Sequence, residues 1–185
     1  MDNGDDQSLI EAVKKGDQQA FATLVHQYQQ PIYNVVYRML SDREEARDVT
    51  QTVFLKTFEN MDSYNPARKF FSWICRIAIN ETINVQSRKK PDTRFDEELV
   101  AAADNGAGNN GPREALEQDE LRAGLEAALM HLNSDHRSAV VLKHVVGMSY
   151  TDISATLEVS EKTVKARLYN ARQKLRERLK KDVCQ

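Results

Sequence analysis

Helix-type periodicity covers almost the whole 185-residue chain and is interrupted by one stretch, residues 91–112. Outside that stretch apolar residues recur at intervals of three and four, and strand-type alternation is nowhere sustained. Within it the apolar period is lost, acidic residues collect, and the sequence ends in DNGAGNNGP. Sequence of this kind is typical of flexible linkers. The pattern therefore predicts an all-α fold: two small helical domains, residues 1–90 and 113–185, joined by a flexible acidic linker over 91–112.

Glycine, proline and capping residues divide the two halves into individual helices. The expected helices are 6–15, 18–30, 31–40, 42–60 and 71–90 in the first half, and 113–132, 135–146, 150–157 and 160–180 in the second. Gly16 and Gly147 are expected to close the helices that precede them. Ser41, followed by Glu44, has the form of a capping box and is predicted to start the helix over 42–60.

Composition and terminal sequence exclude several classes of protein. The chain has 41% hydrophobic and 29% charged residues with only 7 Gly and 4 Pro, which is typical of a globular chain rich in helix formers. No window approaches 18 apolar residues, and the acidic segment Met1–Asp6 is unlike a secretory signal. Cys75 and Cys184 have no partner at the spacing of a disulfide framework or zinc site. We expect a cytoplasmic protein without stable membrane insertion.

No residue pattern indicates an enzyme. The four histidines, His26, His131, His136 and His144, lack metal-ligand spacing, and the sequence contains no Walker, nucleophile-elbow or dinucleotide signature. We therefore expect no catalytic residues, no metal and no cofactor.

Charge is segregated along the chain, although the net charge is only −2. Residues 91–136 carry a charge of −8 (3 basic and 11 acidic), whereas residues 137–185 carry +6 (11 basic and 5 acidic). Clustered Lys and Arg act together in displacing counterions from phosphates. A basic C-terminal unit is therefore typical of a modular nucleic-acid binder.

Residues 147–179 have the spacing of a helix-turn-helix. Ser149 starts a short helix, Glu158-Val159 breaks it, and Ser160 caps a longer one. A non-glycine residue at the turn, Glu158, is expected to cost about 1 kcal/mol. A buried stripe is predicted at Val164, Leu168, Ala171 and Leu175. The opposite face mixes bases with side chains able to read base edges: Lys162, Lys165, Ala166, Tyr169, Asn170, Arg172, Gln173 and Arg176.

A second candidate DNA-binding element lies in residues 61–90, where the composition is aromatic and basic. Trp73, Arg76, Asn80, Asn84 and Ser87 fall on one helical face, opposite an apolar one. Aromatic rings supply stacking and amides supply readout for unstacked bases. The loop before this helix and the helix end add the further candidates Tyr64, Asn65, Arg68, Arg88 and Lys89.

The preceding helix has the features of a protein-binding surface. Its inward stripe is predicted to be Ala46, Val49, Thr50, Val53 and Thr57. Its outward side carries Leu55 among the polar residues Asp48, Gln51, Thr52 and Glu59. An exposed leucine in this setting suggests a protein partner. Asp48 is suited to form an ion pair with Arg or Lys on that partner.

Three motifs, in order, carry a resemblance. They are ARDVTQTVFLK (46–56), FSWICRIAIN (71–80), and the set LNSDHRSAVVL (132–142), GMSYTDIS (147–154) and TVKARL (163–168). Nearly end to end, the chain resembles the extracytoplasmic-function group of bacterial RNA polymerase sigma factors, within the sigma-70 family.

The resemblance implies transcription initiation without catalysis: binding of core RNA polymerase and promoter DNA, with an anti-sigma protein or other regulator as a further partner. It implies polymerase binding by Asp48, Gln51, Thr52 and Leu55. It implies minus-ten binding by Tyr64, Asn65, Arg68, Trp73, Arg76, Asn80, Asn84, Arg88 and Lys89. It implies minus-thirty-five binding by Ser160, Lys162, Thr163, Lys165, Ala166, Arg167, Tyr169 and Arg172. The acidic linker would follow the polymerase's RNA path.

The chain departs from the family pattern at the polymerase-binding helix, where Arg47 and Thr52 stand in place of acidic residues. This predicts weaker or differently controlled docking, and phosphorylation of Thr52 would restore negative charge there. The alternative to a sigma factor is an operator-binding regulator that uses its helix-turn-helix without polymerase.

Overall fold

The computed structural model describes residues 3–89 and 124–183, and the predicted linker 91–112 lies outside these ranges. All regular structure within them is helical, which confirms the predicted fold class. Before the gap the helices are α1 (Asn3–Lys14), α2 (Gln18–Leu40), α3 (Arg43–Glu59), the 3-10 turn η1 (Met61–Ser63) and α4 (Phe70–Lys89). After it come a helix over 124–130, α6 (Ser134–Val140), the π-helical η2 (Val141–Val145), α7 (Tyr150–Leu157) and α8 (Glu161–Val183). None of the described helices combines the length and hydropathy needed to cross a bilayer.

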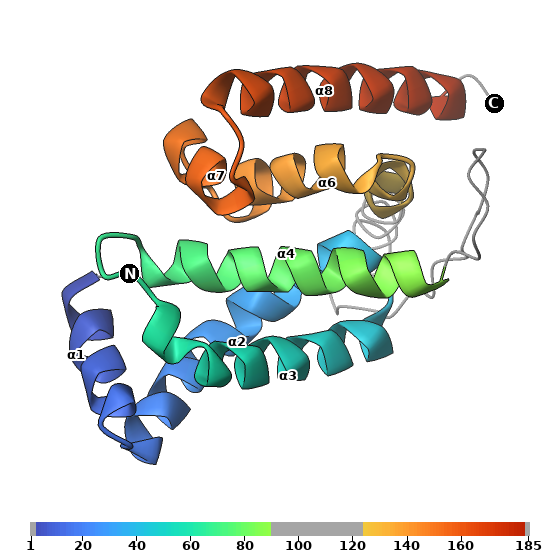
Figure 1. Ribbon diagram of the computed structural model, residues 1–185. Helices are drawn as coiled ribbons and strands as arrows, with labels where there is room; N and C mark the ends of the chain where they lie inside the picture. Colours follow the sequence, from blue (N-terminus) through green and yellow to red (C-terminus); the bar gives the residue numbers. More distant parts are fainter. Residues whose placement is uncertain (1–2, 90–123, 184–185) are drawn as a thin grey trace, which may run out of the picture.

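The first half is built on α2, which packs against α1, α3 and α4 (Figure 1). Its inward face is fully buried over six residues, Leu24, Tyr28, Ile32, Val35, Val36 and Met39. The inward stripe predicted for α3 is buried as expected. The N-terminal helix is fixed by a buried carboxylate, Asp6, which accepts hydrogen bonds from the Tyr28 hydroxyl (2.5 Å) and the Gln27 amide (3.1 Å).

Two predicted details of this half are wrong. The helices expected at 18–30 and 31–40 are one continuous helix, because the buried residues on both sides of Pro31 outweigh the single hydrogen bond that proline cannot donate. Ser41 is not an N-cap: it ends α2 in the left-handed conformation, with φ 57°. The cap of α3 is Asp42, whose side chain accepts a hydrogen bond from the Glu45 amide at 3.0 Å.

The helix-turn-helix prediction is confirmed. The Ser149 hydroxyl accepts a hydrogen bond from the Asp152 amide (3.0 Å), and the Ser160 hydroxyl accepts one from the Thr163 amide (3.1 Å). Between the two caps Glu158 adopts a left-handed conformation, with φ 54°. The predicted stripe on α8 is buried at Val164, Leu168 and Ala171 and half-buried at Leu175.

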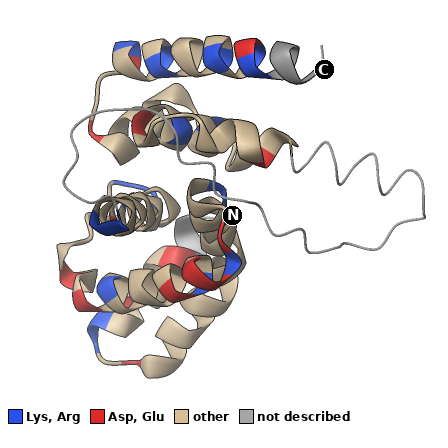
Figure 2. Ribbon diagram, turned by 90° about the vertical axis from the view of Figure 1, so that its right-hand side faces the viewer, with Lys and Arg blue, Asp and Glu red and all other residues tan. Residues whose placement is uncertain are grey.

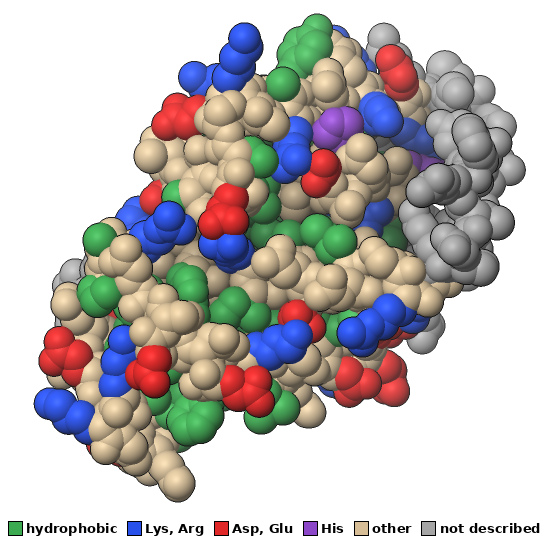
Figure 3. Space-filling view, in the orientation of Figure 1, with side chains coloured by type: hydrophobic (Ala, Val, Ile, Leu, Met, Phe, Trp, Pro, Cys, Tyr) green, Lys and Arg blue, Asp and Glu red, His purple; other side chains and the backbone are tan. Residues whose placement is uncertain are grey.

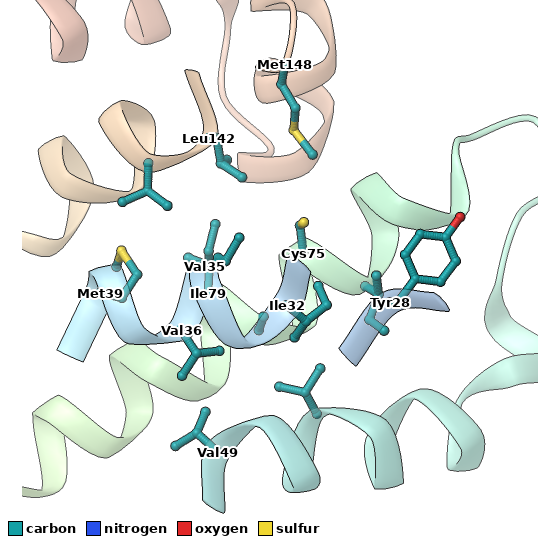
Figure 4. Packing of buried hydrophobic residues seen from close by; sticks show 14 of the residues in the cluster. Tyr28, Ile32, Val35, Val36, Met39, Val49, Cys75, Ile79, Leu142 and Met148 are labelled. Atoms are coloured by element: carbon teal, nitrogen blue, oxygen red, sulfur yellow. The ribbon is translucent and has the colours of Figure 1, made fainter. Parts of the chain in front are cut away.

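The two halves share one hydrophobic core. Figure 4 shows Leu142 and Met148 of the second half pointing toward the layer that contains Val35, Cys75 and Ile79 of the first. In Figure 1, α4 accordingly lies between the α2–α3 layer and the layer of α6 and α7, while α8 lies on the outside. The domains are packed against each other in this structure.

A buried arginine joins the halves at the C-terminal end of α2. Arg137 is 5% exposed, and its guanidinium donates to four backbone carbonyls: Met39 (2.6 Å), Leu132 (2.7 Å), Met130 (2.8 Å) and Leu129 (2.9 Å). Burial lowers the pKa of Arg137 to about 10, so the group stays charged at neutral pH. The positive charge faces the negative end of the α2 dipole.

Candidate nucleic-acid interface

The outer face of α8 presents most of its predicted DNA-contacting side chains to solvent. Lys162, Lys165, Ala166 and Arg172 are exposed, and Tyr169 is 63% exposed. Figure 2 shows basic segments repeating along this helix, at the edge of the molecule. Ser160 caps the N-terminus of α8. An exposed helix face that carries basic and polar side chains fits a DNA major groove.

Two predicted members of this face are partly engaged within the protein. Thr163 is half-buried, and its hydroxyl lies 2.9 Å from that of Ser160. Arg167 is half-buried and pairs with Asp135 at 2.8 Å. The side chain lies beside the buried stripe and ties α8 to α6, so the predicted phosphate contact by Arg167 requires this ion pair to open.

The C-terminal part of α4 presents the predicted amide-rich face. Asn80, Asn84, Ser87 and Arg88 are exposed. Lys89 is exposed as well, but its ammonium pairs with the Glu45 carboxylate at 2.7 Å. That hydrogen bond raises the pKa of Lys89 above its usual value.

The loop before α4 is organised by its aromatic residues. Tyr64 is 6% exposed, packs against Phe70 and Trp73, and donates its hydroxyl hydrogen to the Arg68 carbonyl at 2.5 Å. Tyr64 therefore shapes the loop in this structure, and its predicted contact with DNA requires the ring to leave this packing. Asn65 accepts a hydrogen bond from the Ala67 amide (2.9 Å), and Arg68 remains exposed.

The N-terminal part of α4 is covered by α7. Arg76 forms an ion pair with Glu158 at 2.5 Å, and Lys69 pairs with Asp152 at 3.1 Å. Basic and acidic side chains meet along this boundary in Figure 3. Burial raises the pKa of the Asp152 carboxyl, but hydrogen bonds from Ser149 and Lys69 have the larger combined effect, and the pKa is lowered below its usual value. A predicted minus-ten residue is thus held by the turn of the helix-turn-helix.

The outward face of α3 carries an apolar pair, Leu55 and Phe58, of which the sequence predicted only Leu55. Leu55 is 65% exposed, as expected, and Asp48 and Gln51 beside it are exposed. Phe58, one turn further on, is 51% exposed and packs one ring edge against Phe21. The spacing of Leu55 and Phe58 at i, i+3 was the available signal for this patch.

The two threonines of this helix differ in access. Thr50 is 9% exposed, and its hydroxyl donates to the Ala46 carbonyl. Thr52 is half-buried, and its hydroxyl donates to the Asp48 carbonyl. Only Thr52 therefore belongs to the outward face, as its predicted position on the helix requires.

Comparison with known proteins identifies both halves. Residues 24–91 match Sigma-70 region 2, and residues 122–175 match Sigma-70 region 4. The ECF RNA polymerase sigma factor SigW of Bacillus subtilis is 35% identical over 184 residues, covering 92% of this chain and 95% of SigW. The RNA polymerase sigma-H factor of Pseudomonas aeruginosa is 33% identical, covering 91% of this chain and 90% of that protein.

A solved structure of CnrH, in complex with the cytosolic domain of CnrY, has a similar fold, with a TM-score of 0.71 at 25% identity. That similarity covers 96% of this chain and 99% of CnrH. The ordered pair of sigma-70 regions, together with relatives matched over nearly their whole length, places this chain in the extracytoplasmic-function sigma factors of the sigma-70 family, which are transcription initiation factors and not enzymes.

Proposed function

We propose that this sigma factor docks on core RNA polymerase through the outward face of α3 and directs it to promoter DNA. The observation that carries the assignment is the exposed pair Leu55 and Phe58, surrounded by the polar residues Asp48, Gln51 and Thr52. An apolar centre with a polar rim is the usual anatomy of a protein interface. Phe58 is added here to the four residues expected from the sequence.

The exposed end of α4 and its preceding loop are proposed to bind the minus-ten element. Asn80, Asn84 and Arg88 are accessible in the packed conformation. Half-buried Trp73 and ion-paired Arg76 and Lys89 become available only after local rearrangement. The outer face of α8, with Lys162, Lys165, Ala166, Tyr169 and Arg172, is proposed to bind the minus-thirty-five element as duplex.

Simultaneous contact with both elements requires the domains to separate. The elements lie about 25 base pairs apart, which is roughly 85 Å of duplex at ~3.4 Å per base pair. In this structure Arg76 touches Glu158, three residues before the start of α8. A helix of 23 residues is about 35 Å long, so no part of α8 reaches the required distance while this pair is intact.

The boundaries 1–90, 91–112 and 113–185 remain our proposal for the two domains and the acidic linker, and the linker is proposed to follow the RNA path of polymerase. We place the protein in the cytoplasm, where its polymerase partner acts. A protein regulator that covers α3 or a DNA-binding face is also proposed, and the CnrH–CnrY complex of a relative supports a partner of this kind.

Run-off transcription with bacterial core polymerase on promoter fragments from the host tests the function. We expect transcripts that appear only when this protein is added, and at least tenfold weaker polymerase binding by a Leu55→Ala/Phe58→Ala variant. Loss of the Phe58–Phe21 ring pair should lower the free energy of unfolding by about 0.5–1.5 kcal/mol, so thermal unfolding should show a folded variant of slightly lower stability. Specific retention of duplex DNA without polymerase binding would instead establish the operator-binding alternative.

A further inference from the structure

A pocket of about 400 Å³ lies where the C-terminal part of α2, the first turns of α3, and η2 meet. The functions proposed above do not use it. Its walls are formed by four residues of α2, two of α3 and one of η2: Tyr33, Asn34, Tyr37, Arg38, Arg43, Arg47 and Val145. Its volume falls within the range of small-molecule sites.

Three guanidinium groups and no carboxylate are among the residues that line the pocket, while the Glu126 carboxylate contacts Tyr37 and Arg38 from beside it and Arg43 interacts with the Tyr37 side chain. Arg38 pairs with Glu126 at 2.6 Å, and this contact uses only part of its five donors. Arg47 lies 3.9 Å from Glu44, and both side chains are largely exposed, so this ion pair is weak. Guanidinium groups bind phosphate through paired, planar hydrogen bonds.

One wall of the pocket is aromatic. The rings of Tyr33 and Tyr37 are stacked, with centroids 6.1 Å apart and planes 10° from parallel. Both side chains are half-buried, which fixes their orientation while leaving ring surface accessible. A planar ring of a ligand gains from stacking on such a surface. An inorganic anion would use the arginines and leave this wall and most of the volume unfilled.

We propose that this pocket binds a nucleotide, with its phosphates on Arg43 and Arg47 and its base against Tyr33. The combination of adjacent guanidinium groups and a stacked aromatic wall favours this ligand over an acidic peptide, which has carboxylates but no planar ring. The pocket lies beside the polymerase-binding face of α3, and Arg47 is one of the positions at which the sequence departs from the family pattern.

Packing of the two halves completes the site. Val145 closes it from η2, and Glu126 holds both Arg38 and the Tyr37 hydroxyl, which donates to it at 3.0 Å. A ligand that binds only the packed state shifts the equilibrium toward that state, about tenfold at ten times its Kd. Because contact with both promoter elements requires separated domains in the proposed function, nucleotide binding should weaken promoter binding by the complex of this protein with polymerase.

Calorimetric titration of the full chain at about 150 mM salt tests the site without polymerase. The probes are ATP and GTP, their nucleosides, inorganic pyrophosphate and a poly-glutamate peptide. We expect at least one nucleotide to bind at least tenfold more tightly than its nucleoside, pyrophosphate and the peptide. Arg43→Gln/Arg47→Gln should weaken that binding at least tenfold, and Tyr33→Ala should weaken nucleotide but not pyrophosphate binding.

The matched control is Lys14→Gln/Lys15→Gln, which removes the same charge from exposed positions elsewhere. Thermal unfolding verifies that every variant is folded. Equal loss in the control pair, tighter binding of the peptide or pyrophosphate, or no nucleotide binding would overturn the proposal.

A second pair of titrations, of labelled protein with core polymerase and of labelled promoter with the resulting complex, separates this idea from the proposed function. Added nucleotide should weaken promoter binding by the polymerase complex of the wild-type chain and not by that of Arg43→Gln/Arg47→Gln, since any effect on polymerase itself is common to both. Failure of polymerase to bind without nucleotide would refute the proposed function while leaving the calorimetric result intact. Nucleotide binding without this difference would refute the coupling.

Discussion

Substitution of Glu158 is expected to separate two opposing contributions to stability. The residue has φ 54°, and a left-handed non-glycine residue costs about 1 kcal/mol, of which glycine's larger unfolded-state entropy offsets about 0.5 kcal/mol. The carboxylate pairs with Arg76, but the two side chains are 54% and 34% exposed. A partly exposed pair contributes about 0.2–1 kcal/mol. We expect Glu158→Gln to lower the free energy of unfolding by about 0.5 kcal/mol, because the ion pair is lost. The free energy of unfolding of Glu158→Gly should be about 0.5 kcal/mol higher than that of Glu158→Gln, because glycine relieves the left-handed strain.

Urea unfolding at low salt and at about 1 M salt measures both contributions, because the Debye length falls to ~3 Å at the higher concentration. The loss in Glu158→Gln should shrink in high salt, whereas the difference between the glycine and glutamine variants should persist. Arg76→Gln should reproduce the low-salt loss, and the double variant should lose no more than either single one. A salt-independent loss, or additive losses from Arg76→Gln and Glu158→Gln, would show that the ion pair contributes nothing to the domain contact.

Three further results are expected. Arg137→Met should lower the free energy of unfolding by about 3–5 kcal/mol in urea titrations, because four buried carbonyls lose their donor. Arg172→Gln should weaken duplex binding for all sequences and reduce the salt slope by about 1 in fluorescence titrations. Burial, and then hydrogen bonding to Asp6, raises the pKa of Tyr28 above its usual value of 10.0. The stabilisation by the neutral phenol is therefore fully present below pH 10.0 and is lost as the pH rises beyond that value. Chemical unfolding at a series of pH values should show the free energy of unfolding falling above pH 10.0.

The parts of the fold that the sequence predicted are those fixed by local signals. The hydroxyl groups of Ser149 and Ser160 accept hydrogen bonds from backbone amides three residues later in the chain. Their capping roles can therefore be predicted from a few neighbouring residues. The amphipathic stripes of α3 and α8 likewise follow from periodicity. At Pro31 the local rule failed, because burial of Tyr28 and Ile32 on adjacent turns decides the outcome and burial depends on the rest of the fold.

The candidate site was predictable as a set of helix faces but not as a set of available side chains. Exposure of Lys165 and Tyr169 follows from the stripe on the opposite side of α8. The engagement of Arg76 by Glu158 joins residues 82 positions apart and depends on how the two halves pack. The role of Arg137 could not be predicted from the sequence either, because its partners are backbone carbonyls, which every residue has. A linker composition that permits both packed and separated domains holds no information on these contacts.

The resistance to domain separation is therefore distributed unevenly across the boundary. The ion pairs Arg76–Glu158 and Lys69–Asp152 are partly exposed, contribute about 0.2–1 kcal/mol each, and can be exchanged for water or phosphate. Leu142 and Met148 are 0% and 7% exposed, and uncovering a side chain of this size costs about 1.5–3 kcal/mol. The apolar layer and Arg137 thus set most of the free energy of opening, while the ion pairs fix which surfaces meet. In the proposed function, the contacts made with polymerase and both promoter elements must together offset that opening free energy before Arg76 is released toward DNA.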